Sequence, residues 1–203
     1  MFKELTLEQF VDEVASNRAV PGGGSVAAVV AAQGTALLEM VCQLTVGKKN
    51  YVDVSEAMDD KRRNLEPIRR RLLDLSEEDS ASYAKVMEAF GLPKETDDDK
   101  AARSKAIQDA TYEAALVPLE VAKTALKALE EAPFIFEKGN KNAVSDAQVA
   151  SLMLRSAILS ALYNVTINTE SLKDETKRNE LDDEVQVLRK EALALERDVI
   201  GSL

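Results

Sequence analysis

Two long stretches of the chain are apolar on every side and predict buried core helices. The first spans residues 25–46 and holds one charged side chain, Glu39. The second spans residues 143–170, where Arg155 is the only charged residue between Asp146 and the end of the helix. A helix without a polar face is buried among other helices when it is part of a globular protein. We therefore expect both helices to lie at the centre of a bundle.

Further segments show helical periodicity with one apolar side, which is typical of helices packed around a core. Residues 54–90 repeat apolar side chains at helical spacing. Pro67 and Pro118 fall inside predicted helices and are expected to kink them or mark a restart. No stretch of any length alternates in the manner of a strand. The predicted helices span residues 6–17, 25–46, 54–90, 97–131, 143–170 and 174–200.

Local signals mark several helix ends. Thr6 and Gln9 have the spacing of a capping box, and Ser25 is the expected N-cap of the first apolar helix. Gly47 suits the position just after a helix C-terminus. Pro133 marks a stop or a restart of the chain. The boundaries therefore follow from capping chemistry as well as from periodicity.

The last predicted helix has a 4-3 apolar seam, typical of an outer bundle helix or of a dimer contact. Together with the two apolar helices it gives more apolar surface than one bundle is expected to cover. We therefore predict an all-α, single-domain helical bundle that forms a homodimer. The seam consists of Leu181, Val185, Leu188, Ala192, Leu195 and Val199.

Composition narrows the classes of function. The chain has 203 residues and a formal net charge of −10, which disfavours nucleic acid as a partner. It contains no histidine, so Ser-His-Asp and Cys-His catalysis and His-ligated zinc are excluded. Cys42 is the single cysteine and forms no disulfide within the chain. Residues 1–20 are too charged for a signal peptide. Gln33, Glu39 and Gln43 argue against a membrane-spanning helix, so a cytoplasmic protein is expected.

A glycine-bearing loop leads into each apolar helix. The first reads PGGGS and the second KGNKNAVSDA, at residues 138–147. Adjacent glycines let a ligand approach the backbone, and a helix start attracts anions. Neither a GxGxxG nor a P-loop spacing is present. Lys48 and Lys49 follow the first apolar helix, where they either cap its negative end or bind a carboxylate or phosphate.

Two carboxylates are candidates for chemistry. Asp79, like Ser82, falls where the apolar stripe of residues 54–90 predicts a core side chain, and a polar group there needs a partner or has a use. Simple exposure or a register changed by Pro67 would also explain it. Asp146 lies in the first turn of the second apolar helix, where a capping or dipole-pairing role is the alternative. Neither of them, nor Glu39, has the spacing of a metal site, so no metal is expected.

Five motifs in order resemble the cyclodeaminase/cyclohydrolase family of folate enzymes over essentially the whole chain. They read PGGGSVAA, LTVGKKNY, GLPKET, KGNKNAVSDA and NVTIN. The resemblance implies an all-helical fold that dimerises and acts on the one-carbon unit at N5 and N10 of tetrahydrofolate. One branch of the family closes 5-formiminotetrahydrofolate to 5,10-methenyltetrahydrofolate and releases ammonia. Another hydrolyses 5,10-methenyl- to 10-formyltetrahydrofolate, and these motifs do not separate the two.

The resemblance also implies roles for residues. It favours Asp146 as the catalytic carboxylate, with Asp79 as the second candidate. The lysines would hold the tail of a folate carrying one or more glutamates, and a separate formiminotransferase would supply formimino-substrate. No cofactor beyond the tetrahydrofolate substrate is expected. A helical scaffold without catalysis is the alternative from another class. The candidate substrate-binding residues are Gly22, Gly23, Gly24, Ser25, Lys48, Lys49, Lys138, Asn140, Lys141, Asn142, Asn164 and Asn168.

Overall fold

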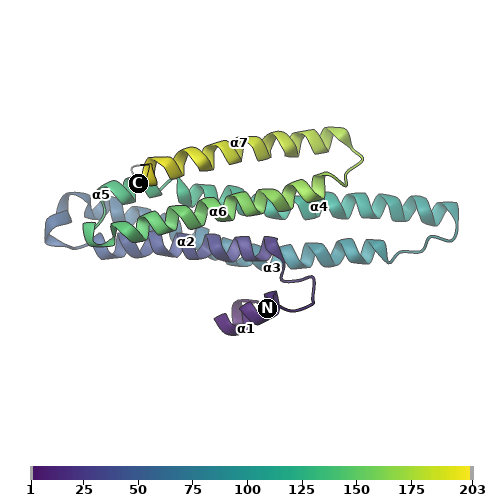
Figure 1. The fold of residues 1–203 in the computed structure, drawn as a ribbon, viewed down its shortest axis with the longest axis horizontal. Helices are drawn as coiled ribbons and strands as arrows, with labels where there is room; N and C mark the ends of the chain where they lie inside the picture. Colours follow the sequence, from purple (N-terminus) through teal and green to yellow (C-terminus); the bar gives the residue numbers. More distant parts are fainter. Residues whose placement is uncertain (1, 202–203) are drawn as a thin grey trace.

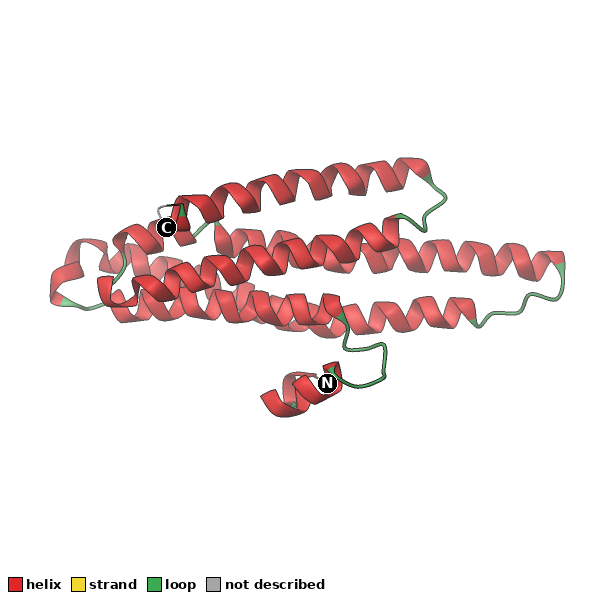
Figure 2. Cartoon of the chain, viewed as in Figure 1, coloured by secondary structure: helices red, strands yellow, loops and turns green. Residues whose placement is uncertain are grey.

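The computed structural model describes residues 2–201, and every regular element within them is helical (Figures 1 and 2). The prediction of an all-α bundle is confirmed, because no strand occurs in that range. Three short 3₁₀ segments accompany the α-helices. In order the elements are η1 (Phe2–Glu4), α1 (Leu7–Val14), α2 (Gly23–Thr45), η2 (Lys49–Val54), α3 (Ser55–Phe90), α4 (Asp97–Leu129), α5 (Ala132–Lys138), η3 (Lys141–Ala143), α6 (Val144–Thr169) and α7 (Glu175–Ile200).

The two apolar helices, α2 and α6, lie side by side in the bundle, as predicted. α2 packs against α3 and α6, with α4 behind it, and α7 covers α4 and α6 (Figure 1). Small side chains let the backbones come close: a Cβ atom on Gly34 would lie 2.9 Å from Leu154 Cγ. Fully buried alanines such as Ala28 and Ala31 extend this close contact. Dense packing of this kind compensates for the small number of aromatic side chains.

The charged side chain in the middle of each apolar helix, Glu39 in α2 and Arg155 in α6, is paired with a neighbouring helix. Glu39 of α2 accepts a hydrogen bond of 2.6 Å from Arg69 Nε of α3. Arg155 Nε of α6 donates a hydrogen bond of 2.7 Å to Glu196 of α7, whose side chain is buried. A charge removed from water is tolerated when it gains a partner of opposite sign. These two pairs therefore tie the apolar helices to the amphipathic ones.

Most predicted helix ends are confirmed, and one is wrong. Thr6 and Gln9 form the predicted capping box. Gly47 follows the end of α2 with a φ of +71°, the left-handed conformation that favours glycine. Ser25 does not cap α2, because the helix begins at Gly23 with Gly22 as its N-cap. The hydroxyl of Ser25 instead contacts Asp79 of α3. The error arises because Ser25 has a tertiary partner that its local sequence does not reveal.

The prolines act differently from one another. Pro67 and Pro118 lie within the continuous helices α3, of 36 residues, and α4, of 33 residues. Neither helix restarts at its proline, although Pro67 is exposed and only Pro118 is buried. Pro133 lies in the first turn of α5, which confirms the predicted restart there.

The seam of α7 faces its own bundle. Leu181, Val185, Leu188, Ala192 and Val199 are all buried against the rest of the chain. The outer-helix interpretation is therefore confirmed, and the alternative that this seam forms a dimer contact is wrong. Any apolar surface left for a second copy must lie elsewhere.

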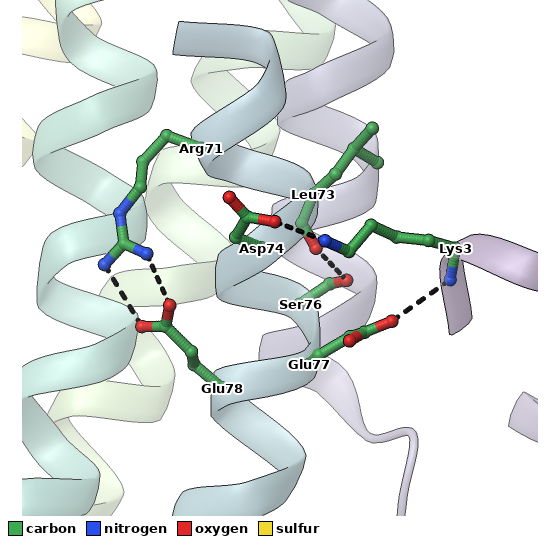
Figure 3. Close-up of polar contacts among 7 residues, drawn as sticks. All are labelled: Lys3, Arg71, Leu73, Asp74, Ser76, Glu77 and Glu78. Atoms are coloured by element: carbon green, nitrogen blue, oxygen red, sulfur yellow. Dashed lines mark hydrogen bonds and ion pairs between the residues drawn. The ribbon is translucent and has the colours of Figure 1, made fainter. Parts of the chain in front are cut away.

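The N-terminal segment rests on the outer side of α3 (Figure 3). Lys3 forms an ion pair with Asp74, and its backbone N–H donates a 3.2 Å hydrogen bond to Glu77. α1 itself stands beside the bundle and buries none of its residues (Figure 1). Its apolar side remains open, with Leu7 70% and Val11 55% exposed.

Two segments are long and apolar enough to pass for membrane spans by length and composition. These are α2 and residues 141–169, with 56% and 44% of the relevant stretches buried inside the bundle. Core helices of a bundle meet the same criterion, because a helix surrounded by other helices needs no polar face.

Candidate functional site

The start of α2 and the middle of α3 meet around a half-buried carboxylate, Asp79. The hydroxyl of Ser25 donates a hydrogen bond of 2.9 Å to Asp79 Oδ2. Ser25 and Ser80 lie 3.1 Å apart through their hydroxyl oxygens. Since Ser25 gives its proton to Asp79, Ser80 is the donor in that second contact. Two serines and one aspartate thus form a connected chain of hydrogen bonds across the α2–α3 contact.

Position 24 has room only for glycine, because the side chain of Asp79 lies against it. A Cβ atom placed on Gly24 would lie 2.2 Å from Asp79 Oδ1 and 2.6 Å from its carboxyl carbon. Its backbone is helical, and among residues 2–201 a positive φ occurs only at Gly47. A positive φ is therefore not the reason for the glycines at positions 22–24. The glycine at this position permits close approach, here of a side chain from the chain itself.

The surroundings of Asp79 favour its neutral form. Burial raises the pKa of the Asp79 carboxyl above its ordinary value, and hydrogen bonds from Ser25 offset part of that rise. No cation is among the causes of the shift. A carboxyl group with a raised pKa takes up and returns protons more readily near neutral pH than an ordinary aspartate.

Asp79 opens into a cavity of about 340 Å³ at one end of the bundle. The side-chain amide of Asn164 in α6 lies beside Gly23, with its Nδ2 3.6 Å from where a Cβ would be. Asn168, one turn later, donates a 2.9 Å hydrogen bond to the backbone carbonyl of Asn164. Polar groups from α2, α3 and α6 therefore converge on one space. The cavity is lined by Ala19, Val20, Gly22, Gly23, Gly24, Asp79, Ser82, Tyr83, Val86, Ala114, Asn164, Ile167 and Asn168.

The second glycine-bearing loop is fixed to the other end of α2. The backbone N–H of Asn140 donates to Thr45 Oγ1 at 2.9 Å, and its side-chain amide donates to the carbonyl of Leu44 at 2.9 Å. The backbone N–H of Lys141 donates to the hydroxyl of Tyr51 at 2.9 Å. Asn140 Oδ1 also accepts a 3.0 Å hydrogen bond from the N–H of Asn142. The amide of Asn140 is thus engaged in holding the loop.

The lysines gather at this same end. Lys48 and Lys49 are exposed and form no ion pair with another described residue. Lys138 pairs with Glu137 at 2.7 Å, and Lys141 Nζ donates to the carbonyl of Glu137 at 2.8 Å. The loop region therefore presents positive charge to solvent.

The predicted site residues fall into two clusters within one chain. Gly22, Gly23, Gly24, Ser25, Asp79, Asn164 and Asn168 are together at the start of α2. Lys48, Lys49, Lys138, Asn140, Lys141, Asn142 and Asp146 are at its other end. At 1.5 Å per residue, the 23 residues of α2 separate the two by about 33 Å.

Asp146 stays a predicted catalytic residue. It is half-buried in the first turn of α6 and forms no hydrogen bond or ion pair with residues 2–201. Asn164 lies 18 residues further along the same helix, or about 27 Å away. Asp146 and the Asp79 cavity therefore do not meet inside one chain.

Sequence reasoning missed Tyr83 and the outward side of the two apolar helices. A second hollow of about 390 Å³ runs between α2 and α6 and shares Gly23 and Asn164 with the Asp79 cavity. Its walls include Ser156 and Ser160. In the sequence this hollow corresponds to small residues at helical spacing. The same pattern is equally typical of close packing in a core, so it did not identify a hollow.

The described residues offer no obvious metal centre. No group of three or more His, Cys, Asp or Glu side chains within residues 2–201 is arranged to hold an ion. Cys42 is buried in the core, and desolvation, followed by the charges of Glu131 and Glu39, raises the pKa of its thiol to about 12. A thiol held neutral in this way is a poor nucleophile.

Known proteins resemble the chain along its whole length. A methenyltetrahydrofolate cyclohydrolase from Methylorubrum extorquens is 41% identical over 190 residues, which cover 94% of this chain and 91% of that protein. A formimidoyltransferase-cyclodeaminase from Mus musculus is 34% identical over 203 residues. That match covers 98% of this chain but 37% of the mouse protein, so the chain spans about a third of such relatives.

A comparison of structures agrees with the comparison of sequences. The crystal structure of a formiminotetrahydrofolate cyclodeaminase from Thermotoga maritima matches with a TM-score of 0.88 and 32% sequence identity. The match covers 98% of this chain and 96% of that one. Residues 6–187 also match the family described as formiminotransferase-cyclodeaminase. With fold, sequence and motif order in agreement, the chain belongs to the formiminotransferase-cyclodeaminase family.

Proposed function

We propose that the chain acts on the one-carbon unit at N5 and N10 of tetrahydrofolate, as a formiminotetrahydrofolate cyclodeaminase. The observation that carries this proposal is the Asp79 cavity. It combines a carboxyl group of raised pKa with the amides of Asn164 and Asn168. The whole-length likeness to a cyclodeaminase of known structure supports the choice of substrate.

Asp79 is suited to both proton transfers of ring closure. N10 attacks the formimino carbon on N5, and a tetrahedral carbon forms that holds both nitrogens and an amino group. Asp79 takes the proton released by N10 and returns it to the amino group, which leaves as ammonia. The product is the 5,10-methenyl cation, so no net proton is consumed after a protonated formimino group enters. The amides orient the ring nitrogens, a role typical of the few polar groups in a small-molecule site.

A second candidate is the hydrolysis of 5,10-methenyltetrahydrofolate to 10-formyltetrahydrofolate. It is favoured by the 41% identity to a cyclohydrolase of nearly the same length. Water adds to the methenyl carbon while Asp79 accepts one of its protons. The remaining hydroxyl then loses its proton to become the formyl oxygen, N5 takes up a proton, and the bond from the carbon to N5 breaks, so that one proton is released overall. Both reactions pass through a tetrahedral carbon between N5 and N10. One carboxyl group can therefore serve either.

The proposal extends to partners and location. Some relatives are named as formimidoyltransferase-cyclodeaminases, so we infer that a formiminotransferase supplies the formimino-substrate. The substrate carries one or more glutamates, and the chain works as a homodimer in the cytoplasm. The proton transfers above use side chains of the protein alone, and no metal or cofactor beyond the tetrahydrofolate is included.

Absorbance of methenyltetrahydrofolate tests the proposal directly. With 5-formiminotetrahydrofolate the absorbance should rise and ammonia should be released in equal amount. With 5,10-methenyltetrahydrofolate a fall faster than the uncatalysed one would identify the cyclohydrolase instead. Absence of both changes, with correctly folded protein, rejects a folate enzyme and leaves the helical scaffold.

A further inference from the structure

The buried hydroxyl of Ser25 differs from the other buried hydroxyl groups of α2 and α6 in what it contacts. Thr35, Thr45 and Ser151 each donate to the backbone carbonyl four residues earlier, at 2.7–2.9 Å. A serine or threonine inside a helix commonly satisfies its hydroxyl in this way. Ser25 lies in the first turn of α2, before such a helical carbonyl is available, and donates to Asp79 Oδ2 of α3 instead. Its proton is therefore directed to one side chain of another helix.

Ser80 determines where the single proton of the Ser25 hydroxyl points. Ser25 is fully buried, so its hydroxyl is held by protein groups. The hydroxyl oxygen of Ser80, the residue after Asp79 in α3, lies 3.1 Å from that of Ser25. A hydroxyl oxygen both donates and accepts, so Ser80 can donate to Ser25 while Ser25 donates to Asp79. A donor at Ser80 thus keeps the Ser25 proton on the carboxyl group.

The two oxygens of the Asp79 carboxyl are made different by this chain of hydrogen bonds. Oδ2 accepts the Ser25 hydroxyl, whereas Oδ1 is the oxygen nearest to Gly24, which lines the cavity. An incoming proton is favoured on Oδ1, because Oδ2 then keeps its bond from Ser25. Neither Ser25 nor Ser80 lines the cavity. Both serines are therefore placed to act on a substrate through Asp79.

Both proton transfers of the proposed reaction need a carboxyl oxygen in a fixed place. One proton leaves N10 and returns to the amino group on the same carbon. The outer torsion of an aspartate side chain is broad, so the carboxyl plane turns unless hydrogen bonds hold it. Among the described residues that line the cavity there is no Lys or Arg that could hold it by charge. Ser25 is the side chain that fixes this plane.

We propose that Ser25 and Ser80 are positioning residues of the Asp79 site, an inference that rests on the proposed function. Ser80 directs the Ser25 hydroxyl to Asp79, and Ser25 holds Oδ2 so that Oδ1 exchanges the proton with the substrate. The same hydrogen bond stabilises the ionised carboxyl, which is the form that accepts the proton of N10. The serine of the PGGGS loop thus serves the chemistry without touching the folate.

The pH dependence of kcat tests the role of Ser25. Ser25→Ala removes the hydroxyl from a position where a helix accepts alanine, so kcat should fall roughly tenfold with KM nearly unchanged. The acid limb of the profile should move to higher pH by about one unit, the scale of one hydrogen bond to a charged group. Tyr83 of α3 is the only other titratable side chain among the described residues of the lining, and α2, α4 and α6 contribute none. The limb therefore reports Asp79.

The matched control is Ser76→Ala, because Ser76 is buried in the same helix as Asp79 and donates to the carbonyl of Leu73. Its pH profile should equal that of the wild type. A loss of packing lowers activity by the same factor at every pH and leaves the acid limb in place. An unmoved limb in Ser25→Ala therefore overturns the inference.

Two changes at Ser80 separate its hydroxyl from its packing. Ser80→Ala should move the acid limb in the same direction as Ser25→Ala, but by less, since the Ser25 hydroxyl is then present but undirected. Ser80→Thr keeps the hydroxyl at a half-buried position and should restore the wild-type profile. Equal profiles for the alanine and threonine variants would remove Ser80 from the positioning chain.

The ionisation of Asp79 can also be followed without turnover. NMR titration of protein with carboxyl-labelled aspartate, assigned through Asp79→Asn, gives the pKa of the Asp79 carboxyl in each variant. This pKa should be higher in Ser25→Ala than in the wild type, because the donor to the ionised form is lost. If wild-type protein turns over neither folate, the proposed function fails. The titration then decides the positioning role alone, and equal pKa values in the two proteins reject it.

Discussion

The loops that lead into α2 and α6 both contain glycine, but they differ in what surrounds it. A Cβ on Gly24 would meet the Asp79 side chain at 2.2 Å, whereas a Cβ on Gly139 would meet the backbone oxygen of Ile135 at 2.4 Å. The first glycine makes room for a functional group at a cavity. The second makes room for a tight turn of the chain itself, which Asn140 then fixes to α2.

The difference shows that a glycine-bearing loop before a buried helix does not by itself indicate a ligand site. At the start of α2 the polar groups face a cavity, and burial raises the pKa of Asp79. At the start of α6 the loop is hydrogen-bonded to the end of α2 and to Tyr51, and its lysines are exposed. One loop is therefore suited to chemistry and the other to recognition of charge.

The largest effect is expected at Asp79. Asp79→Asn keeps the shape of the side chain but removes proton transfer, so kcat should fall roughly 100-fold or more, the usual scale for acid–base catalysis. Binding of the folate should persist. Asp74→Asn is the matched control, because Asp74 lies on the outer side of the same helix and pairs with Lys3. A normal kcat in the Asp79 variant would remove this residue from the chemistry.

Gly24→Ala should lower kcat by roughly 10- to 100-fold, because the added methyl group pushes the Asp79 carboxyl out of place. The helix itself accepts alanine, so the melting temperature should change little. Gly139→Ala should show the opposite pattern, since the oxygen of Ile135 belongs to the backbone and cannot move aside. A loss of about 2 kcal/mol in the free energy of unfolding is expected there. Equal effects in both variants would contradict the comparison.

Asp146→Asn measures how far the second loop takes part in chemistry. With Asp79 as the proton carrier, kcat should fall by less than about tenfold, below the range for loss of an acid–base group. A fall as large as that of Asp79→Asn would instead support the catalytic role that the sequence predicts for Asp146. Circular dichroism of both variants excludes unfolding as the cause.

Lys48→Ala/Lys49→Ala should raise KM about fivefold at low ionic strength and leave kcat nearly unchanged. Exposed ion pairs are weak and screened by salt, so the effect should shrink at high salt. The change should be largest for substrates with several glutamates. If KM is unchanged even for a polyglutamylated substrate, the lysines do not hold the tail.

The smallest effect concerns stability and pH. The pKa of Asp79 is raised in the folded state, so folding favours its protonated form. Stability from this group is thus present below the ordinary aspartate pKa and is lost as pH rises through the raised value. Asp79→Asn should therefore melt at an equal or higher temperature than wild type at neutral pH. The difference should vanish in acid, and a lower melting temperature at neutral pH would contradict this.

Much of the fold follows from the sequence, because helical periodicity and local capping are properties of neighbouring residues. The apolar stretches that became α2 and α6, the capping box of Thr6 and the restart at Pro133 are confirmed for this reason. Helix ends differ from the predicted ones by a few residues. The polar break in the apolar stripe also pointed to Asp79 before its partners were known.

Only the tertiary structure decided which residues share a site. Sequence spacing gives positions along a helix but not which end of one helix lies beside which end of another. It therefore grouped the lysines with both glycine loops, although α2 holds Lys48 and Asp79 about 33 Å apart. The partner of Ser25, the burial that raises the pKa of Asp79 and the inward direction of the α7 seam likewise depend on contacts between distant residues. The sequence by itself determined the helices and the candidate chemistry, and packing determined where that chemistry can occur.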